Sequence, residues 1–133
     1  MRIARTPRAV SAGVPAGDDA PRLRLRMRVM LGEAIAVGPG KIALLEALQR
    51  THSINGAAKR LGMSYRRAWL LIDELNAALT EPAVRSATGG AHGGGSELTA
   101  VGEELVRLYR AIEQHAQQAC ADDIARLLGL LAR

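Results

Sequence analysis

The fold is decided by the stretch Ser53-Ile54-Asn55-Gly56-Ala57-Ala58-Lys59-Arg60-Leu61-Gly62-Met63-Ser64-Tyr65-Arg66-Arg67-Ala68-Trp69. Ser53 and Ser64 are good helix N-caps, and Gly62 suits the positive φ of a tight turn between two helices. Ala58 is the small residue that two steeply crossing helices need where they touch. The stretch therefore predicts a helix-turn-helix.

Helical spacing continues on both sides of this motif. After the break at Gly38-Pro39-Gly40, apolar residues predict a helix from about Lys41 to Thr51-His52. The helix that begins at Ser64 should reach about Thr80 before Pro82. Its core-facing positions are expected to be Ala68, Leu71 or Ile72, and Leu75.

Two regions show strand patterns. Apolar residues alternate with four arginines between Arg22 and Val29, the period of two typical of a half-buried strand. The arginine face suits a solvated sheet surface or a position near phosphate. Further along, short strands at residues 83–88 and 96–99 enclose a glycine-rich run. A hairpin with a flexible loop, the wing of a winged helix, is expected there.

The C-terminal third predicts one long helix. Apolar residues recur at spacings of three and four from Leu105 to Leu131, so a helix capped by Thr99 should run from about Ala100 most of the way to Arg133. If continuous, it is about 50 Å long at roughly 1.5 Å per residue. So small a domain cannot bury that stripe, which favours pairing with a second copy. Cys120, on the stripe, is expected to be buried.

These elements predict a mostly α winged helix-turn-helix with a small β-hairpin wing, an N-terminal strand and a long C-terminal dimerisation helix. The expected division is a flexible N-terminal arm at residues 1–20, a DNA-binding domain at 21–99 and the dimerisation helix at 100–133.

Charge favours a polyanionic partner. The 133 residues carry 18 Lys and Arg against 13 Asp and Glu, a net charge of +5, and the excess lies in the first 80 residues. Nucleic acid is the first candidate and an anionic membrane the second. A single cysteine favours a reducing compartment. No signal-peptide core is recognisable, and no apolar run nears the roughly 20 residues of a membrane span. A cytoplasmic protein without membrane attachment is expected.

The side chains expected to touch DNA lie on the motif and the wing. The second helix should present its N-terminal residues to the major groove, and arginine can donate to both O6 and N7 of guanine. Trp69 suits either a DNA contact or a brace between the wing and this helix, and packing is the commoner fate of a lone tryptophan. The complete set of expected DNA-binding residues is Ser64, Tyr65, Arg66, Arg67, Trp69, Lys59, Arg60, Arg85, Thr88 and His92.

Neither catalysis nor a cofactor is expected. His52, His92 and His115 are far apart and form no HxxH or HExxH pattern that would suit a metal. The glycine run lacks the GK[ST] of a phosphate-binding loop. No nucleophile, base and orienting group can be assembled from these motifs, so the protein is not expected to be an enzyme.

The sequence resembles the N-terminal domain of the molybdate-responsive regulators (ModE) and, more distantly, the DNA-binding domain of LysR-type regulators. The resemblance covers roughly residues 22–120. It rests on Ser53–Trp69, on the wing segment Ala87–Gly95 and on Leu98-Thr99-Ala100-Val101-Gly102. It implies a homodimer, joined through the strand region and the long helix, that docks two recognition helices on a palindromic operator.

Full-length members of that family carry C-terminal molybdate-binding domains of the small β-barrel type, and this sequence ends before them. The expected function is therefore a sequence-specific DNA-binding transcriptional regulator. Its expected partners are double-stranded DNA and a second copy of itself, with no small-molecule effector bound directly. Two alternatives stay open: an interaction module that pairs with a separate sensor subunit, and a small oxyanion-binding protein.

Overall fold

The computed structural model describes residues 19–87 and 95–132. These fall into two compact units, one spanning Arg26–Glu113 and the other made of residues up to Leu25 together with Gln114 onwards. Most of the expected N-terminal arm, and the tip of the expected wing, lie outside the described residues.

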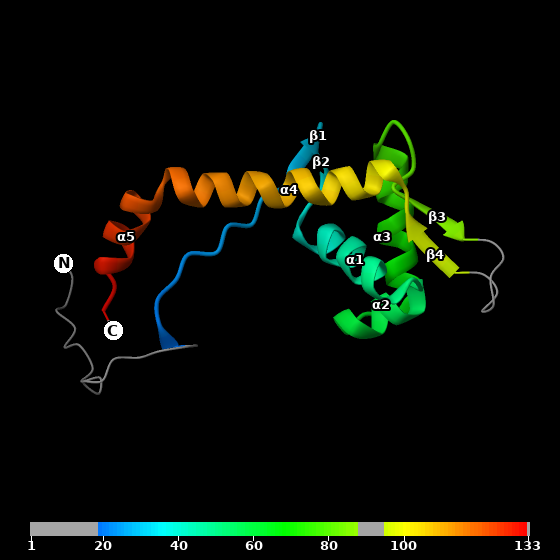
Figure 1. Cartoon of the computed structure of the whole chain (residues 1–133), viewed down its shortest axis with the longest axis horizontal. Helices are drawn as coiled ribbons and strands as arrows, with labels where there is room; N and C mark the ends of the chain where they lie inside the picture. The colour runs from blue at the N-terminus through cyan, green and yellow to red at the C-terminus, as the bar shows by residue number, and fades with distance from the viewer. Residues whose placement is uncertain (1–18, 88–94, 133) are drawn as a thin grey trace. The chain divides into compact units, whose positions relative to one another are not determined.

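The described elements are helices with two small antiparallel hairpins (Figure 1). Their order is β1 (Val29–Leu31), β2 (Ala34–Val37), α1 (Pro39–Thr51), α2 (Ile54–Leu61), α3 (Tyr65–Ala78), β3 (Val84–Ala87), β4 (Gly95–Leu98), α4 (Ala100–Ala119) and α5 (Ala121–Gly129). The mostly helical winged helix-turn-helix expected from the sequence is confirmed.

One apolar core holds the Arg26–Glu113 unit together. Helices α1, α2 and α3 pack on each other, and β4 lies against α1. The predicted core face of α3 is correct: Ala68, Ile72 and Leu75 are buried, whereas Leu71 is half-buried. The largest fully buried side chains are Ile42, Leu44, Leu45, Leu48 and Leu75.

The turn between α2 and α3 has the local chemistry that the motif predicts. Gly62 adopts φ +70°, a left-handed conformation that glycine takes without a Cβ penalty. Its N–H donates to the Lys59 carbonyl at 3.2 Å, and the Met63 N–H donates to the Ala58 carbonyl at 3.0 Å. This pair of bonds is a Schellman motif, which satisfies the last carbonyls of α2 and aims the chain into α3.

The N-terminal strand is shorter and lies later than predicted. Residues 21–28 form no strand, and β1 pairs with β2 across a two-residue turn in which Gly32 has φ +62°. The predicted alternation is nevertheless visible in exposure, since the arginines from Arg22 to Arg28 are exposed and the leucines and Met27 between them are half-buried. The prediction was wrong because a strand needs a hydrogen-bonded neighbour, and side-chain alternation does not supply one.

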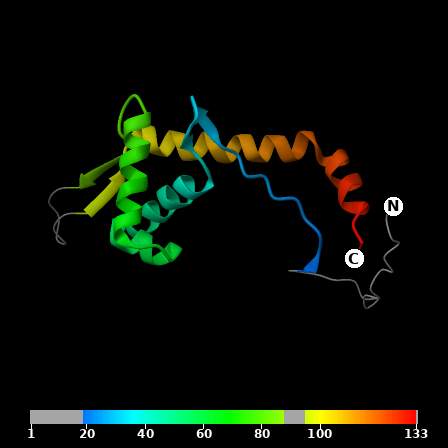
Figure 2. The same cartoon turned by 180° about the vertical axis from the view of Figure 1, so that it is seen from behind.

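The second hairpin, β3 with β4, is joined tightly to the helices. Val84 pairs with Leu98, and the two strands run side by side beyond α3 (Figure 2). The Ser96 N–H donates to the His52 carbonyl at the end of α1, at 3.1 Å. A Cβ at Gly95 would lie 2.9 Å from that same carbonyl oxygen, so only glycine fits this approach without a shift. The hairpin therefore has a fixed base on the helical core.

The start of α4 is capped as predicted. The Thr99 hydroxyl accepts from the Gly102 N–H at 3.1 Å and donates to the Pro82 carbonyl at 2.7 Å. Gly102 is buried against the Ala83 carbonyl, with no room for a side chain. The beginning of α4 is thus held against Pro82 and Ala83, the residues just before β3.

The long C-terminal helix is not continuous. Helix α4 ends at Ala119, and Cys120 has the non-helical angles φ −105° and ψ 16° before α5 begins. Asp122 and Asp123 occupy the first turn of α5, where acidic side chains stabilise a helix N-terminus. The expectation that Cys120 is buried was wrong for the single chain, in which it is exposed. No helix within residues 19–87 or 95–132 combines the length and apolar composition that crossing a bilayer demands.

Candidate nucleic-acid interface

The first turn of α3 carries the side chains singled out from the sequence. The Ser64 hydroxyl accepts from the Arg67 N–H at 3.0 Å, which satisfies a backbone donor that the helix itself leaves unpaired. Tyr65, Arg66 and Arg67 are all exposed, as expected of residues that reach into a groove. No acidic side chain lies in this turn, so its helix dipole and its two guanidiniums act together on an approaching anion.

The residues of α3 lie on distinct faces. At about 100° per residue, Arg66 and Leu70 point away from the buried stripe of Ala68, Ile72 and Leu75, so they occupy the outer face. Leu70 is 52% exposed and was missed in the sequence. An apolar residue on the outer face of a recognition helix suits contact with a thymine methyl group.

Tyr65 and Trp69 share one flank of α3. They are 50% and 43% exposed, so neither ring lies in the core. Packing of Trp69 against the wing stays a prediction, because residues 88–94 lie outside the described residues. The Trp69 Nε1–H donates to the Tyr65 hydroxyl at 2.7 Å. The two aromatic rings are thus linked to each other on the helix surface.

Asn76 lies on the same flank and connects α3 to the wing. Its Oδ1 accepts from the Ala83 N–H at 2.8 Å and from the Val84 N–H at 3.3 Å. Its Nδ2 donates to the Val84 carbonyl at 3.3 Å. The side-chain amide of Asn76 therefore fixes the start of β3 beside the recognition helix. Sequence reasoning missed Asn76, because only the fold brings residues 76 and 83–84 together.

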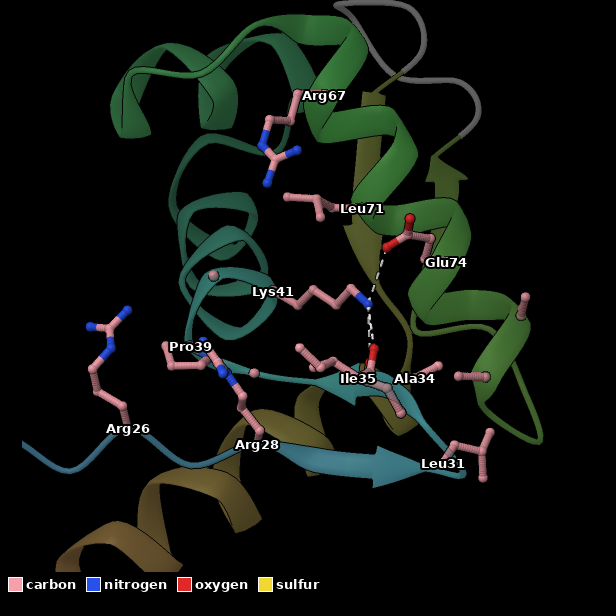
Figure 3. Close-up of a pocket in the computed structure, with 15 residues that line it drawn as sticks. Arg26, Arg28, Leu31, Ala34, Ile35, Pro39, Lys41, Arg67, Leu71 and Glu74 are labelled. Carbon is pink, nitrogen blue, oxygen red and sulfur yellow. Dashed lines mark hydrogen bonds and ion pairs between the residues drawn. The ribbon is translucent and has the colours of Figure 1, made fainter.

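The opposite flank of α3 borders a groove (Figure 3). Arg67 and Leu71 line it with the β1–β2 hairpin and the start of α1, around a cavity of about 760 Å³. Inside it, Lys41 Nζ donates to the carbonyls of Ile35 and Ala36 at 3.1 and 3.3 Å, and it lies 3.3 Å from Glu74 Oε1. Lys41 is only 8% exposed. Its ammonium has three donors, and these three acceptors account for all of them.

The Lys41 contacts tie α3 to β2 by a second route. Glu74 is on α3, so the ammonium of Lys41 bridges the recognition helix and the carbonyl edge of the hairpin. The recognition helix is therefore anchored on both flanks, by Asn76 on one and by Lys41 on the other. In the sequence, Lys41 marks only the start of a predicted helix.

The other expected contact residues are placed around this helix. Lys59 and Arg60 lie exposed in the last turn of α2. Arg85, at the base of the wing, is exposed and lies 2.9 Å from Glu97 on β4, so any phosphate contact would compete with that ion pair. Thr88 and His92 lie outside the described residues.

These features define a winged helix-turn-helix protein: two helices joined at Gly62, a capped and exposed recognition helix, and a hairpin fixed beside it.

No family model matches the chain, but several curated proteins do. It is 42% identical over 100 residues to the molybdenum transport protein ModE of Azotobacter vinelandii, covering 75% of this chain and 37% of that protein. It is 40% identical over 109 residues to the transcriptional regulator ModE of Yersinia pestis, covering 80% and 41%. The molybdenum-pterin-binding protein MopB of Rhodobacter capsulatus is 46% identical over 77 residues, which cover 58% and 28%.

These similarities support a ModE-family N-terminal region for this chain. The chain spans about two fifths of the length of the first two relatives.

Proposed function

We propose that this chain binds double-stranded DNA in a sequence-specific manner and regulates transcription, and that it does so in the cytoplasm and without enzymatic activity. The observation that carries the proposal is the first turn of α3, where capped backbone and exposed Tyr65, Arg66 and Arg67 project from a helix braced on both flanks. Relatives that are named as transcriptional regulators support this proposal.

The proposed active form is a homodimer, in which residues 100–133 serve mainly to pair two copies. Leu108 and Ile112 of α4 are 44% and 53% exposed and four residues apart, so they form an apolar strip on one helix face. Leu127 of α5 and Leu131, which follows the end of that helix, are 51% and 52% exposed and add apolar surface in the same region of the sequence. A second copy is the simplest cover for such strips. Two recognition helices would then read half-sites about 34 Å apart, or a multiple of that distance.

The decisive experiment starts with duplexes selected from a random library by the wild-type chain. Binding to a selected duplex and to an unrelated duplex is then measured by fluorescence anisotropy over a range of salt concentrations. We expect selected DNA to be preferred, and affinity to fall steeply with salt, because each neutralised phosphate releases counterions.

Arg66→Ala and Arg67→Ala test the base-reading role. Loss of a bidentate contact to guanine should weaken binding to selected DNA by roughly 5- to 150-fold, with a much smaller loss on unrelated DNA. Arg107→Ala is the matched control, because it removes the same charge from an exposed helix position whose partner is Glu104. Equal losses on both duplexes for all three variants would contradict sequence reading by α3.

The interaction-module alternative has a distinct outcome in the same preparation. Wild-type chain that retards no duplex, yet co-purifies with a stoichiometric heterologous protein, would replace DNA binding as the function.

A further inference from the structure

We propose that Trp69 is a positioning residue that holds the Tyr65 hydroxyl as a directed hydrogen-bond donor to one phosphate oxygen of bound DNA. This inference rests on the DNA-binding function proposed above and assigns the pair a defined task within it.

The hydrogen bond between Trp69 and Tyr65 determines which donor of the pair remains for a ligand. An indole N–H can only donate, so the 2.7 Å contact between Trp69 Nε1 and the Tyr65 hydroxyl uses a lone pair of the phenol oxygen. The hydroxyl hydrogen of Tyr65 must then point elsewhere. Within residues 19–87 and 95–132, no group accepts it. Among the described residues, the phenol therefore keeps one donor that is not used.

The position of the pair selects the kind of acceptor. Arg66 and Leu70 occupy the outer face of α3, which would meet base edges, whereas Tyr65 and Trp69 lie on a flank, which would meet the wall of the groove. Groove walls are lined by phosphates, and tyrosine is among the side chains that bond to phosphate oxygens. Phosphate oxygens only accept, so they match the remaining donor.

Local charge strengthens the choice. Tyr65 is the first residue of a 14-residue helix whose first turn contains two arginines and no acidic residue. The partial positive charge of the helix N-terminus adds to those cations. A phosphate beside the Tyr65 hydroxyl would therefore lie in a favourable field.

The indole has a second effect, on conformational freedom. Both rings are about half exposed, so a lone Tyr65 would sample several rotamers in the free protein. The bond from Trp69 restricts the phenol before DNA arrives, and less side-chain entropy is then lost on binding. Trp69→Phe keeps an aromatic ring of similar kind and removes only the N–H group and the extra ring.

The test uses duplexes selected by the wild-type chain, in which one phosphate at a time is replaced by a neutral methylphosphonate. We expect Tyr65→Phe to weaken binding to the unmodified duplex by about 5- to 10-fold. It should also abolish the sensitivity to substitution at one phosphate per half-site while leaving the other sensitive phosphates unchanged. Trp69→Phe should lose sensitivity at that same phosphate, and the double variant should bind no worse than either single variant.

Tyr109→Phe is the matched control, since Tyr109 is the second of the two tyrosines and its buried hydroxyl donates to the Met27 carbonyl at 2.7 Å. Its phosphate pattern should equal that of the wild type. Additive losses, or an unchanged pattern in Trp69→Phe, would overturn the positioning role and leave DNA binding intact. If the loss of affinity in Tyr65→Phe depends on the identity of one base pair, and the sensitivity to every phosphate substitution is unchanged, the Tyr65 hydroxyl reads a base instead. A wild-type chain that binds no duplex would overturn both proposals.

Discussion

Two glycines in the first turns of two helices allow one substitution to be tested in opposite environments. Gly40 is the second residue of α1 and Gly102 the third of α4. A Cβ at Gly40 would meet nothing within 4 Å, whereas a Cβ at Gly102 would collide with the Ala83 carbonyl. The same change, glycine to alanine, should therefore have opposite signs at the two positions.

The magnitudes follow from two terms. Alanine stabilises a helix by about 0.5–1 kcal/mol relative to glycine, because an alanine residue loses less conformational freedom on folding. At Gly102 this gain is opposed by forced repacking, which costs typically ~1–3 kcal/mol in a well-packed core. The neighbour there cannot move easily, since the Ala83 carbonyl also accepts from the Thr99 N–H at 2.9 Å. We expect Gly102→Ala to be destabilised by about 1–2 kcal/mol net, and Gly40→Ala to be stabilised.

The assay is urea unfolding followed by far-ultraviolet circular dichroism, at one fixed protein concentration. With a slope of about 1–3 kcal/mol per molar urea, the midpoints of the two variants should differ by ~1 M. Equal slopes would show that the two variants expose similar surface on unfolding. A midpoint for Gly102→Ala equal to or above that of Gly40→Ala would refute the close approach of α4 to β3.

Three further predictions concern the turn, the wing and an ion pair. Gly62→Ala should lower the free energy of unfolding by about 1–2 kcal/mol, because the left-handed backbone there penalises a Cβ, and an unchanged melting temperature would contradict this. Asn76→Ala should loosen the hold of α3 on β3, so amide hydrogen exchange in the wing strands should quicken while that of α1 stays unchanged. Exchange that quickens equally in both would instead indicate global destabilisation. The bond from Arg110 lowers the pKa of Glu46 below 4.5, so its stabilisation is present above that pH and is lost as the pH falls through the lowered pKa. Glu46→Gln should flatten the decline of stability in acid, and a slope as steep as that of the wild type would show that this pair does not contribute.

The local features of the motif were predictable from sequence because they depend on neighbours along the chain. The hydroxyls of Ser53 and Ser64 each accept a hydrogen bond from a backbone N–H three residues further along the chain. Gly62 allows the turn because its own backbone adopts a positive φ. The exposed first turn of α3 follows from helical periodicity, once its core face of Ala68, Ile72 and Leu75 is recognised.

Two local signals were present but not used. The dipeptide Gly32-Glu33 separates two apolar runs by the length of a hairpin turn, and it marks β1 and β2 better than the alternation before it. Asp122 and Asp123 mark the start of a second helix. The apolar repeat continues into that second helix, although the first helix has already ended. Residue spacing alone does not distinguish one long helix from two in series.

The helix-turn-helix, its caps, its turn and the cations of the recognition helix can be read from local sequence, since each depends on residues no more than about one helical turn apart. The folded arrangement is needed to show that Asn76 holds the wing and that Lys41 joins α3 to β2. It is also needed to show that Gly102 must lack a side chain. These roles depend on groups distant in sequence that meet only when the core closes, and the pairing of a buried polar group is then set by whichever partner the packing brings within reach.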